Sequence, residues 1–366
     1  MQLPLLEDLG DLTDKRVLVR SDLNVPISNG EIDDDFRIRQ SVATWQDLVD
    51  FGAKVTVCSH LGRPNGAPDA RYSMAPVELA VKKLVPEVQV MENLRFSPGE
   101  ELNDPAFVKE LVADQDLYVN DAFGASHREH ASIVGPPRFL PSAAGRLLAD
   151  EIAQLGGVLN DAPPPFVGIL GGAKVSDKIG VIDALLGKVD TMLIGGGMAY
   201  TFLKAIGHEV GNSILQEDQV DYCRRLLGGG KKIILPVDLV VGNAAGEVKV
   251  VGRDIPSGWE GFDIGPATRE LFEEEIVGAQ TLFWNGPVGR FEDERFREGT
   301  RAVAEAMAKT GGTTVIGGGD VVSAVNMFGL VDRLDWVSTG GGAALEFIEL
   351  GDLPGLKALR QTRQST

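Results

Sequence analysis

Short runs of apolar, often β-branched residues alternate along the whole chain with longer segments of helical periodicity. This alternation is typical of parallel sheets whose strands are connected by helices. In the first part of the chain it predicts strands at residues 16–20, 54–58, 88–91 and 117–119. It predicts helices there at residues 37–51, 75–85, 104–112 and 142–155, with Ser142 as the cap of the last helix.

The same alternation continues in the second part. It predicts strands at residues 166–170, 191–194, 232–235, 281–284, 313–316 and 336–337. It predicts helices at residues 178–186, 198–206, 217–227, 266–276, 294–309, 321–328 and 343–349. Residues 239–251 predict a hairpin inserted between a strand and the next helix.

Residues 156–165 are the clearest interruption of this pattern, with two glycines, then Asn160 and Asp161, then three prolines. We expect such a segment neither to continue a helix nor to enter a central strand. A chain of 366 residues is also long for one hydrophobic core. We therefore predict an α/β protein with two doubly wound, Rossmann-like parallel-sheet domains, residues 1–155 and 156–352.

The net charge of −18 argues against nucleic-acid or membrane-surface partners. No uncharged apolar run reaches the ~20 residues of a membrane span. The first residues also lack the basic-then-apolar order of a signal peptide. We therefore expect a soluble, cytoplasmic protein in which Cys58 and Cys223 are reduced thiols.

Arginines and polar residues follow the predicted strands of the first half, where ligands of open α/β sheets bind. These strand ends and the next helix start contain Asp22, Asn24, Arg37, His60, Arg63, Arg95, His127 and Arg128. Guanidinium groups match phosphate and carboxylate geometry, and Asn, Asp and Ser orient hydroxyls. Any single arginine here could instead form a surface salt bridge, and His60 and His127 could be purely structural. Together the residues predict a small, hydroxylated ligand with more than one negative charge.

Glycines follow the predicted strands of the second half, at residues 171–172, 195–197, 317–319 and 340–342. Such turns expose backbone N–H groups to phosphates. Lys174 and Lys178, four apart at a predicted helix start, are expected on one helical face. Asp320 suits either a magnesium ion on nucleotide phosphates or a helix cap. Neither a P-loop nor a Gly-x-Gly-x-x-Gly motif is present, so we predict a nucleotide site of another kind.

Eight segments in order resemble the phosphoglycerate kinase family, from about residue 14 to 350. They are residues 16–26 (RVLVRSDLNVP), 59–64 (SHLGRP), 92–96 (ENLRF), 120–128 (NDAFGASHR), 171–178 (GGAKVSDK), 283–292 (FWNGPVGRFE), 317–320 (GGGD) and 338–343 (STGGGA). The resemblance implies reversible transfer of a phosphoryl group from 1,3-bisphosphoglycerate to ADP, giving 3-phosphoglycerate and ATP. It also implies a cleft between two domains joined by a helical hinge, and a C-terminal tail, residues 353–366, that returns to the first domain.

The resemblance assigns the site residues motif by motif. The glycerate substrate would be bound by Asp22, Asn24, Arg37, His60, Leu61, Gly62, Arg63, Arg95 and Arg128. The nucleotide would be bound as its Mg²⁺ complex by Gly172, Lys174, Lys178, Gly195, Gly196, Asn285, Pro287, Glu292, Gly318, Gly319, Asp320 and Val321, with Asp320 nearest the metal and Glu292 on the ribose. Arg37, Lys174 and Gly341 would act on the phosphoryl group in transfer, in a monomeric enzyme whose cleft closes by hinge bending.

Two positions depart from the family pattern. Val321 stands where the family usually has Thr or Ser, which removes a hydroxyl near the phosphates and leads us to expect altered nucleotide affinity. Arg290 replaces a usually apolar residue and either lies on the surface or adds an anion contact. Two other functions fit the same residues: a kinase acting on another small carboxylate, and a two-lobed protein that closes on an anion without chemistry.

Overall fold

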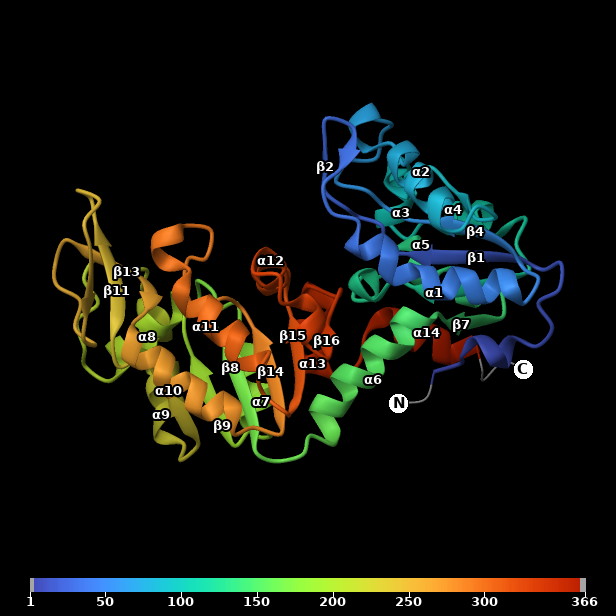
Figure 1. The fold of residues 1–366 in the computed structure, drawn as a ribbon. Coiled ribbons are helices and arrows are strands. Elements are labelled where there is room, and N and C mark those ends of the chain that lie inside the picture. The colour runs from blue at the N-terminus through green and yellow to red at the C-terminus, as the bar shows by residue number, and fades with distance from the viewer. Residues whose placement is uncertain (1–2, 363–366) are drawn as a thin grey trace. The chain divides into compact units, whose positions relative to one another are not determined.

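The computed structural model describes residues 3–362, which divide into two compact units. The first unit holds the residues up to Ala153 together with those from Leu350 onward, and the second unit is Gln154–Glu349. The predicted N-terminal domain and C-terminal tail also include residues 1–2 and 363–366, which lie outside the described residues. Figure 1 labels many of the elements of each unit.

A parallel sheet of five strands forms the centre of the first unit, in the order β5-β4-β1-β6-β7. The strands are β1 (Arg16–Ser21), β4 (Lys54–Cys58), β5 (Gln89–Val90), β6 (Leu117–Asp121) and β7 (Ser142–Ala144). The helices are α1 (Phe36–Asp50), α2 (Ala75–Leu84), α3 (Pro98–Glu101), α4 (Pro105–Val112), α5 (Ala131–Val134) and α14 (Pro354–Thr362). A short hairpin, β2 (Ile27–Ser28) and β3 (Glu31–Ile32), stands apart from the sheet. The strand order reverses on either side of β1, as in doubly wound folds.

Both faces of this sheet are covered, because every residue of β6 and all but the first residue of β1 are buried. Val17 and Val19 point to the face that packs on Trp45 of α1 and Val81 of α2. The alternate residues, including Arg20, point to the opposite face. The period-2 pattern of β1 therefore sends one buried arginine toward α5 and the strand ends.

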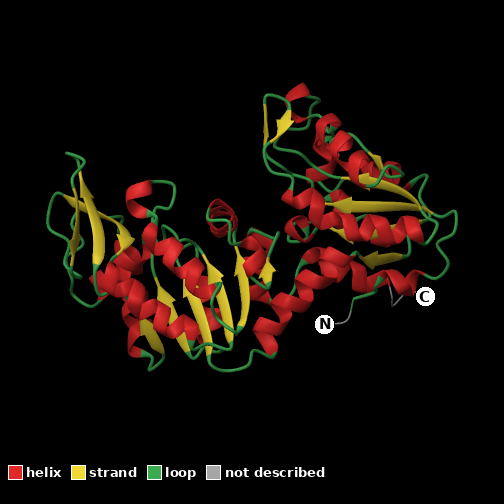
Figure 2. Cartoon of the chain, viewed as in Figure 1, coloured by secondary structure: helices red, strands yellow, loops and turns green. Residues whose placement is uncertain are grey.

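A second parallel sheet, of six strands, forms the centre of the second unit, in the order β10-β9-β8-β14-β15-β16. The strands are β8 (Phe166–Leu170), β9 (Thr191–Ile194), β10 (Lys232–Ile234), β14 (Thr281–Asn285), β15 (Thr313–Gly317) and β16 (Trp336–Val337). The helices are α7 (Ile179–Leu186), α8 (Met198–Ala205), α9 (Val220–Gly228), α10 (Pro266–Val277), α11 (Glu298–Met307), α12 (Gly319–Met327) and α13 (Gly342–Leu350). Figure 2 shows helices lying along the strands of both sheets. The predicted α/β class with two doubly wound sheets is confirmed.

An antiparallel sheet of three strands is inserted in the second unit. It consists of β11 (Leu239–Asn243), β12 (Val248–Val251) and β13 (Trp259–Ile264). The hairpin predicted at residues 239–251 is confirmed as β11 and β12. The sequence pattern missed β13, because glycine and charged residues interrupt its apolar alternation.

The prediction around residues 142–165 was wrong in two respects. Ser142 begins strand β7 rather than capping a helix, and α6 (Arg146–Asn160) continues through Gly156 and Gly157. A buried stripe that includes Leu155, Val158 and Leu159 offsets the weak helix propensity of these glycines. The proline run follows the helix instead of ending it early, and the division between the units falls inside α6.

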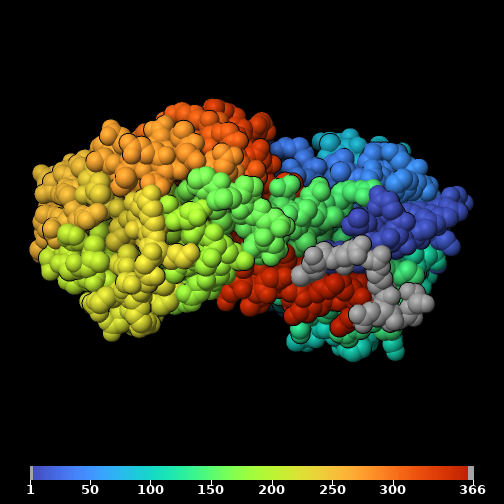
Figure 3. All heavy atoms as spheres, turned by 90° about the horizontal axis from the view of Figure 1, so that it is seen from below, coloured from blue at the N-terminus to red at the C-terminus, as the bar shows by residue number. Residues whose placement is uncertain are grey.

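Helix α14 belongs to the first unit, although it is formed by the last described residues. It contacts α5, β7 and the short 3₁₀ helix Pro136–Arg138, and Figure 3 shows the red C-terminal residues beside blue-green residues. Ala358 packs on Ile133, and the Gly355 N–H donates to the Ser126 carbonyl at 2.9 Å. Among the described residues, no helix is long and apolar enough to cross a membrane.

Candidate functional site

The loops that follow β1, β4 and β5 are tied together in the first unit. The Gly62 N–H donates to Asn24 Oδ1 at 2.8 Å. Asn93 accepts from the Leu61 N–H at 3.2 Å and donates to the Leu61 carbonyl at 2.7 Å. Gly62 has a φ of 59°, and a Cβ there would lie 2.3 Å from the ring of Tyr72. The structure thus brings Asn24, Leu61 and Gly62 together, and Asn93 is a positioning residue that the sequence prediction did not single out.

Asp22 and Arg37 form an ion pair at the end of β1. The carboxyl of Asp22 is buried, whereas the Arg37 guanidinium from the first turn of α1 is half-exposed. Burial alone would raise the pKa of Asp22, but the charges of Arg37 and other neighbours hold it below its ordinary value. Asp22 therefore remains ionised and holds Arg37 at the edge of the site.

Arg95 is nearly buried and lies between two loops. Its Nη1 donates to the Gly62 carbonyl at 2.7 Å, and its Nε lies 2.9 Å from Glu101 Oε1. The second contact is an ion pair without a hydrogen bond. Burial, together with the charges of Arg128 and Arg20, lowers the pKa of Arg95. Because these cations are partly buried away from water, they repel each other, and a bound anion would relieve this repulsion.

Arg20 was not predicted as a site residue, yet its side chain is fully buried, and its charge acts on Arg95. Its Nε donates to Ser132 Oγ at 2.9 Å, and its Nη2 lies 3.0 Å from His60 Nδ1. Because a guanidinium can only donate, His60 Nδ1 accepts, and the neutral ring carries its proton on Nε2. Burial and the Arg20 charge lower the pKa of His60 well below its ordinary value. Arg20 could have been identified from the sequence as a charged residue at an inward-facing position of β1.

Arg63 and Arg128 complete the predicted set of arginines. Arg63 is exposed and Arg128 is half-buried. Among the described residues, neither guanidinium makes a hydrogen bond or an ion pair, although the Arg128 charge contributes to the lowered pKa of both His60 and Arg95. Arg128 thus belongs to the cluster electrostatically, whereas no contact joins Arg63 to it.

A pocket at the strand ends of the second unit is lined by glycine turns. Its volume is about 350 Å³, and it lies where the strand order reverses between β8 and β14. Its lining residues are Gly172, Ala173, Gly196, Gly197, Tyr200, Ile214, Glu260, Gly261, Phe262, Pro287, Gly289, Arg290, Glu292 and Asp320. The pocket therefore gathers predicted residues from four separate strand ends.

The glycine turns approach each other too closely for side chains. The Gly172 N–H donates to the Pro287 carbonyl at 2.9 Å, and the Gly196 N–H to the Val288 carbonyl at 3.0 Å. A Cβ on Gly196, whose φ is 65°, would lie 2.7 Å from the Pro287 oxygen, and one on Gly195 would lie 2.6 Å from Val288. Packing therefore requires glycine here. The prediction that these turns expose N–H groups to phosphates is wrong for Gly172 and Gly196, because both N–H groups already donate to carbonyls.

The prediction that Lys174 and Lys178 share one face of a helix was wrong. Helix α7 begins at Ile179, so both lysines precede it, and Lys178 is its N-cap residue. Lys174 is exposed, and among the described residues nothing pairs with it. Lys178 donates to Asn285 Oδ1, and burial lowers its pKa. The glycines before these lysines delay the helix, which leaves Lys174 on a loop.

Asn285 connects Lys178 to the third glycine turn. Its Nδ2 donates to the Gly317 carbonyl at 2.5 Å, and a Cβ on Gly318 would lie 2.7 Å from this nitrogen. Gly319 and Asp320 are exposed in the first turn of α12. Asp320 lines the pocket, and its charge acts on Lys178.

The side chain of Val321, which was expected near the nucleotide phosphates, is instead fully buried in the core. It packs in the same cluster as Val325 and Ile316. Only its main chain can therefore reach a ligand. Gly341, with a φ of 52°, stands just before α13 and has open space around it.

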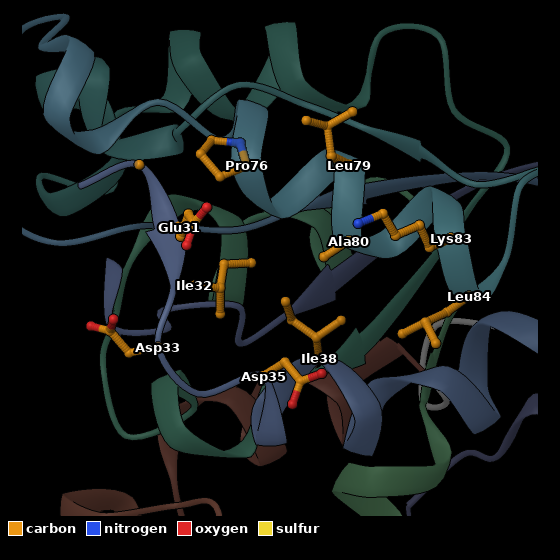
Figure 4. A pocket seen from close by; sticks show the side chains of 11 residues that line it. Glu31, Ile32, Asp33, Asp35, Ile38, Pro76, Leu79, Ala80, Lys83 and Leu84 are labelled. Carbon is orange, nitrogen blue, oxygen red and sulfur yellow. The ribbon is translucent and has the colours of Figure 1, made fainter. Parts of the chain in front are cut away.

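Another pocket, in the first unit, contains none of the predicted site residues. It has a volume of about 730 Å³, and Figure 4 shows its side chains, which come from β3, the segment after it, α1 and α2. Its charged residues are Glu31, Asp33, Asp35 and Lys83. Three acids beside one cation do not suit an anionic substrate, so this pocket is not the predicted anion site.

Within residues 3–362, no group of three or more His, Cys, Asp or Glu side chains could hold a metal ion. Asp320 is an exposed carboxylate beside the glycine turns. A nucleotide-bound Mg²⁺ takes only one or two carboxylates and completes its coordination with phosphates and water. Asp320 therefore fits a metal that arrives with the nucleotide.

Comparison with known proteins gives a consistent result over nearly the full length. A family model described as Phosphoglycerate kinase matches residues 6–91 and 80–350. The phosphoglycerate kinase of Rubrobacter xylanophilus is 48% identical over 382 residues, which covers 97% of this chain and 97% of the relative. A phosphoglycerate kinase of Thermus thermophilus is 48% identical over 378 residues, covering 94% of this chain and 97% of the relative.

Two solved structures resemble the fold. Phosphoglycerate kinase from Coxiella burnetii superposes with a TM-score of 0.90 at 36% identity, covering 98% of this chain and 99% of that one. The enzyme from Pyrococcus horikoshii OT3 superposes with a TM-score of 0.87 at 30% identity, with both chains fully covered.

Proposed function

Because this chain belongs to the phosphoglycerate kinase family and is therefore a kinase, we propose that its two units divide the substrates. The first unit binds 3-phosphoglycerate or 1,3-bisphosphoglycerate, and the second binds ADP or ATP. The observation that carries this division is the contrast between the two sets of strand ends. One presents arginine side chains, and the other presents glycine turns around a pocket.

In the first unit, Arg37, Arg63, Arg95 and Arg128 supply the positive charge for the substrate phosphate and carboxylate. Asp22, Asn24 and the Nε2–H of His60 orient its hydroxyl. Leu61 and Gly62 shape the loop between them. The buried position of Arg95 and its Gly62 contact support a fixed binding geometry rather than a surface ion pair.

In the second unit, the phosphates lie against Gly172, Gly195, Gly196, Gly318 and Gly319, with Lys178 and Asn285 beside them. Pro287 and the main chain of Val321 complete this end, and Glu292 binds the ribose. Mg²⁺ bound to the nucleotide would neutralise phosphate charge, with Asp320 as its protein ligand. The turn geometry and the open pocket support this assignment.

Lys174 and Arg37, from different units, act on the phosphoryl group in transfer, with N–H groups around Gly341. A carboxylate is a good nucleophile and leaving group, so the residues mainly align the reactants, neutralise charge and exclude water. Direct in-line transfer requires both cations to reach the same phosphoryl group, and we propose that hinge closure brings them to it. The exposed, unpaired state of Lys174 supports such a role.

A coupled assay of ATP formation from ADP and 1,3-bisphosphoglycerate tests this function. Turnover only with another acyl phosphate would identify a different carboxylate kinase, and binding without turnover would identify a binding protein. The Arg95→Ala variant tests the division of substrates, because it should raise mainly the KM for phosphoglycerate. A change confined to the KM for ATP would refute the division.

We also propose a monomeric, cytoplasmic enzyme. The acidic surplus supports a protein that stays apart from other copies and from anionic surfaces. Light scattering of the purified chain would measure its mass, and a dimer mass would refute the first part. Cell fractionation would test the second part.

A further inference from the structure

A fully buried glutamate in the first unit takes no part in the proposed substrate contacts. Glu100 is the third residue of α3, a helix that begins where Ser97 Oγ accepts from the Gly99 N–H at 3.2 Å. A Cβ on Gly99 would lie 2.8 Å from Phe107 of α4, so these two helices pack closely. A buried carboxylate requires hydrogen-bond partners to offset its loss of water. The partners of Glu100 therefore show what it holds.

Both carboxylate oxygens of Glu100 accept from one residue of α5, a helix that contacts α3 (Figure 1). Oε2 accepts from the Ser132 N–H at 2.9 Å, and Oε1 accepts from the Ser132 hydroxyl at 2.6 Å. This N–H lies in the first turn of α5 and has no partner within the helix. His130 Nδ1 lies 3.8 Å from Oε1, which is beyond a hydrogen bond. Glu100 thus holds Ser132.

Ser132 connects Glu100 to Arg20 of β1. Arg20 Nε donates to Ser132 Oγ at 2.9 Å, and a guanidinium can only donate. The serine hydroxyl therefore accepts from Arg20 and directs its own proton to Glu100. Arg20 Nη2 in turn donates to His60 Nδ1 at 3.0 Å. Donor and acceptor are thus assigned in every hydrogen bond between Glu100 and His60.

The other end of this chain of hydrogen bonds is the ring that the proposed function places on the substrate. Because Nδ1 of His60 accepts, the proton of the neutral ring is on Nε2, where it can donate to a hydroxyl oxygen. The Arg20 side chain is fully buried, so it acts on a ligand through His60. Arg20 Nη1 also donates to the Ser21 carbonyl. Of these contacts, the one with Ser132 leads to a carboxylate.

We propose that Glu100 is a positioning residue for the glycerate substrate, which keeps His60 in the tautomer that donates from Nε2 by acting through Ser132 and Arg20. This rests on the proposed function, in which His60 orients the substrate hydroxyl. The carboxylate also supplies negative charge for a fully buried guanidinium. Glu100→Gln has one acceptor oxygen, and its amino group would face a donor of Ser132, so this substitution interrupts the chain at its start.

The test combines steady-state kinetics with NMR of the His60 ring nitrogens. Glu100→Gln and Ser132→Ala should each raise the KM for 3-phosphoglycerate by about 10-fold, the effect of about one lost hydrogen bond, with kcat and the KM for ATP within about 2-fold of the wild type. The ring should be the Nε2–H tautomer in the wild type and a mixture of tautomers in both variants. The double variant should be no worse than the worse single variant, because both changes interrupt one chain.

Ser142→Ala is the matched control for Ser132→Ala. Ser142 is also a buried serine of the first unit, and its hydroxyl donates to the Leu140 carbonyl at 2.7 Å, outside the chain from Glu100 to His60. This variant should keep the wild-type KM for 3-phosphoglycerate and the wild-type tautomer. If Glu100→Gln does not fold, Ser132→Ala and its control decide by the same measurements.

Three outcomes would overturn the proposal. A wild-type tautomer in both variants would mean that Glu100 does not act on His60. Equal rises in the KM for ATP and for 3-phosphoglycerate would mean a general loss of structure. Losses that multiply in the double variant would mean that Glu100 and Ser132 act separately. An unchanged KM for 3-phosphoglycerate in His60→Gln would instead refute the proposed role of His60, and the tautomer measurement would still decide what Glu100 does.

Discussion

The two units use the same sheet topology to build candidate anion sites of opposite kinds. In each, the strand order reverses at the first strand of the unit, and the candidate residues follow that strand and its neighbours. The first unit supplies charged side chains held by buried partners, as in the Arg20–His60 contact. The second supplies main chain at positions where no Cβ fits, such as Gly196. Topology thus selects the place of a site, and the residues at the strand ends select its chemistry.

This difference determines which groups give each site its specificity for a ligand. Arg20 and Arg95 are held by hydrogen bonds before a ligand arrives, and repulsion among the buried cations favours an anion. Glycine turns fit a phosphate chain by shape and carry little charge of their own. In the proposed function, the exposed Lys174 adds a positive charge beside them. Substitutions should therefore weaken ligand binding through lost side-chain charge in the first unit and through altered backbone geometry in the second.

The largest expected effect is the loss of either cation that we propose to act on the phosphoryl group. Arg37→Ala and Lys174→Ala should each lower kcat by roughly 10²–10³-fold, the scale for one preorganised charge contact. Steady-state assays in the direction of ATP formation measure this. Arg39→Ala is the matched control, because Arg39 lies on the same helix but is exposed and pairs with Asp35. Near-normal kcat in both site variants would remove these residues from the transfer step.

The second prediction tests the main-chain site. Gly196→Ala places a Cβ against the Pro287 oxygen and at a positive φ, a strain of about 1–2 kcal/mol. The KM for ADP should rise by about 10-fold or more, while the KM for the glycerate substrate stays within about 2-fold. Gly187→Ala is the control, since that position has no neighbour within 4 Å. A larger change in the glycerate KM than in the ADP KM would contradict the comparison.

The position of most candidate residues at strand ends could be predicted because strand ends are marked by local sequence. Apolar runs such as residues 166–170 end abruptly in glycine or polar residues, and the predicted and observed strand bounds agree closely. Long-range partners could not be predicted in this way. The Arg20 contact with Ser132 joins residues 112 positions apart, and no local pattern records it.

Local propensity also failed where tertiary packing or a turn overrode it. Gly156 and Gly157 remain helical in α6 because its apolar face is buried. The opposite error concerned Lys174, where helical spacing suggested a helix but the glycine turn delays its start. A spacing of four residues carries structural meaning only after the helix start is known.

The third prediction concerns the effect of pH on stability, through a histidine near the arginines of the first unit. Burial, followed by the charges of Arg95, Arg128 and Arg20, lowers the pKa of His130 to about 4, despite Glu100 at 3.8 Å. Because the folded pKa lies below the unfolded value, the unfolded chain binds the proton first as pH falls. The stability contributed by keeping His130 neutral is fully present above about pH 6.5 and is lost as the pH falls toward about 4.

Urea unfolding of the wild type and His130→Gln at pH 7 and pH 5 measures this effect. Between these values the wild type should lose about 1.5 kcal/mol more stability than the variant, as expected for one histidine with such a shift. His208→Gln, in the second unit, should follow the wild type, because His208 lies outside the arginine network. Parallel pH dependence in wild type and His130→Gln would show that the network does not act on this ring.

The smallest functional effect is expected at Val321, where side chain and main chain have different roles. Val321→Thr buries a hydroxyl in a core cluster, so it should cost about 1–3 kcal/mol of unfolding free energy. The KM for ADP should change by less than about 2-fold, because the main chain at the start of α12 is retained. The partly buried Val322 gives the control, and Val322→Thr should cost less stability. A KM lowered more than about 5-fold without a loss of stability would mean that the threonine turns toward the phosphates, so that a side chain contributes to the main-chain site.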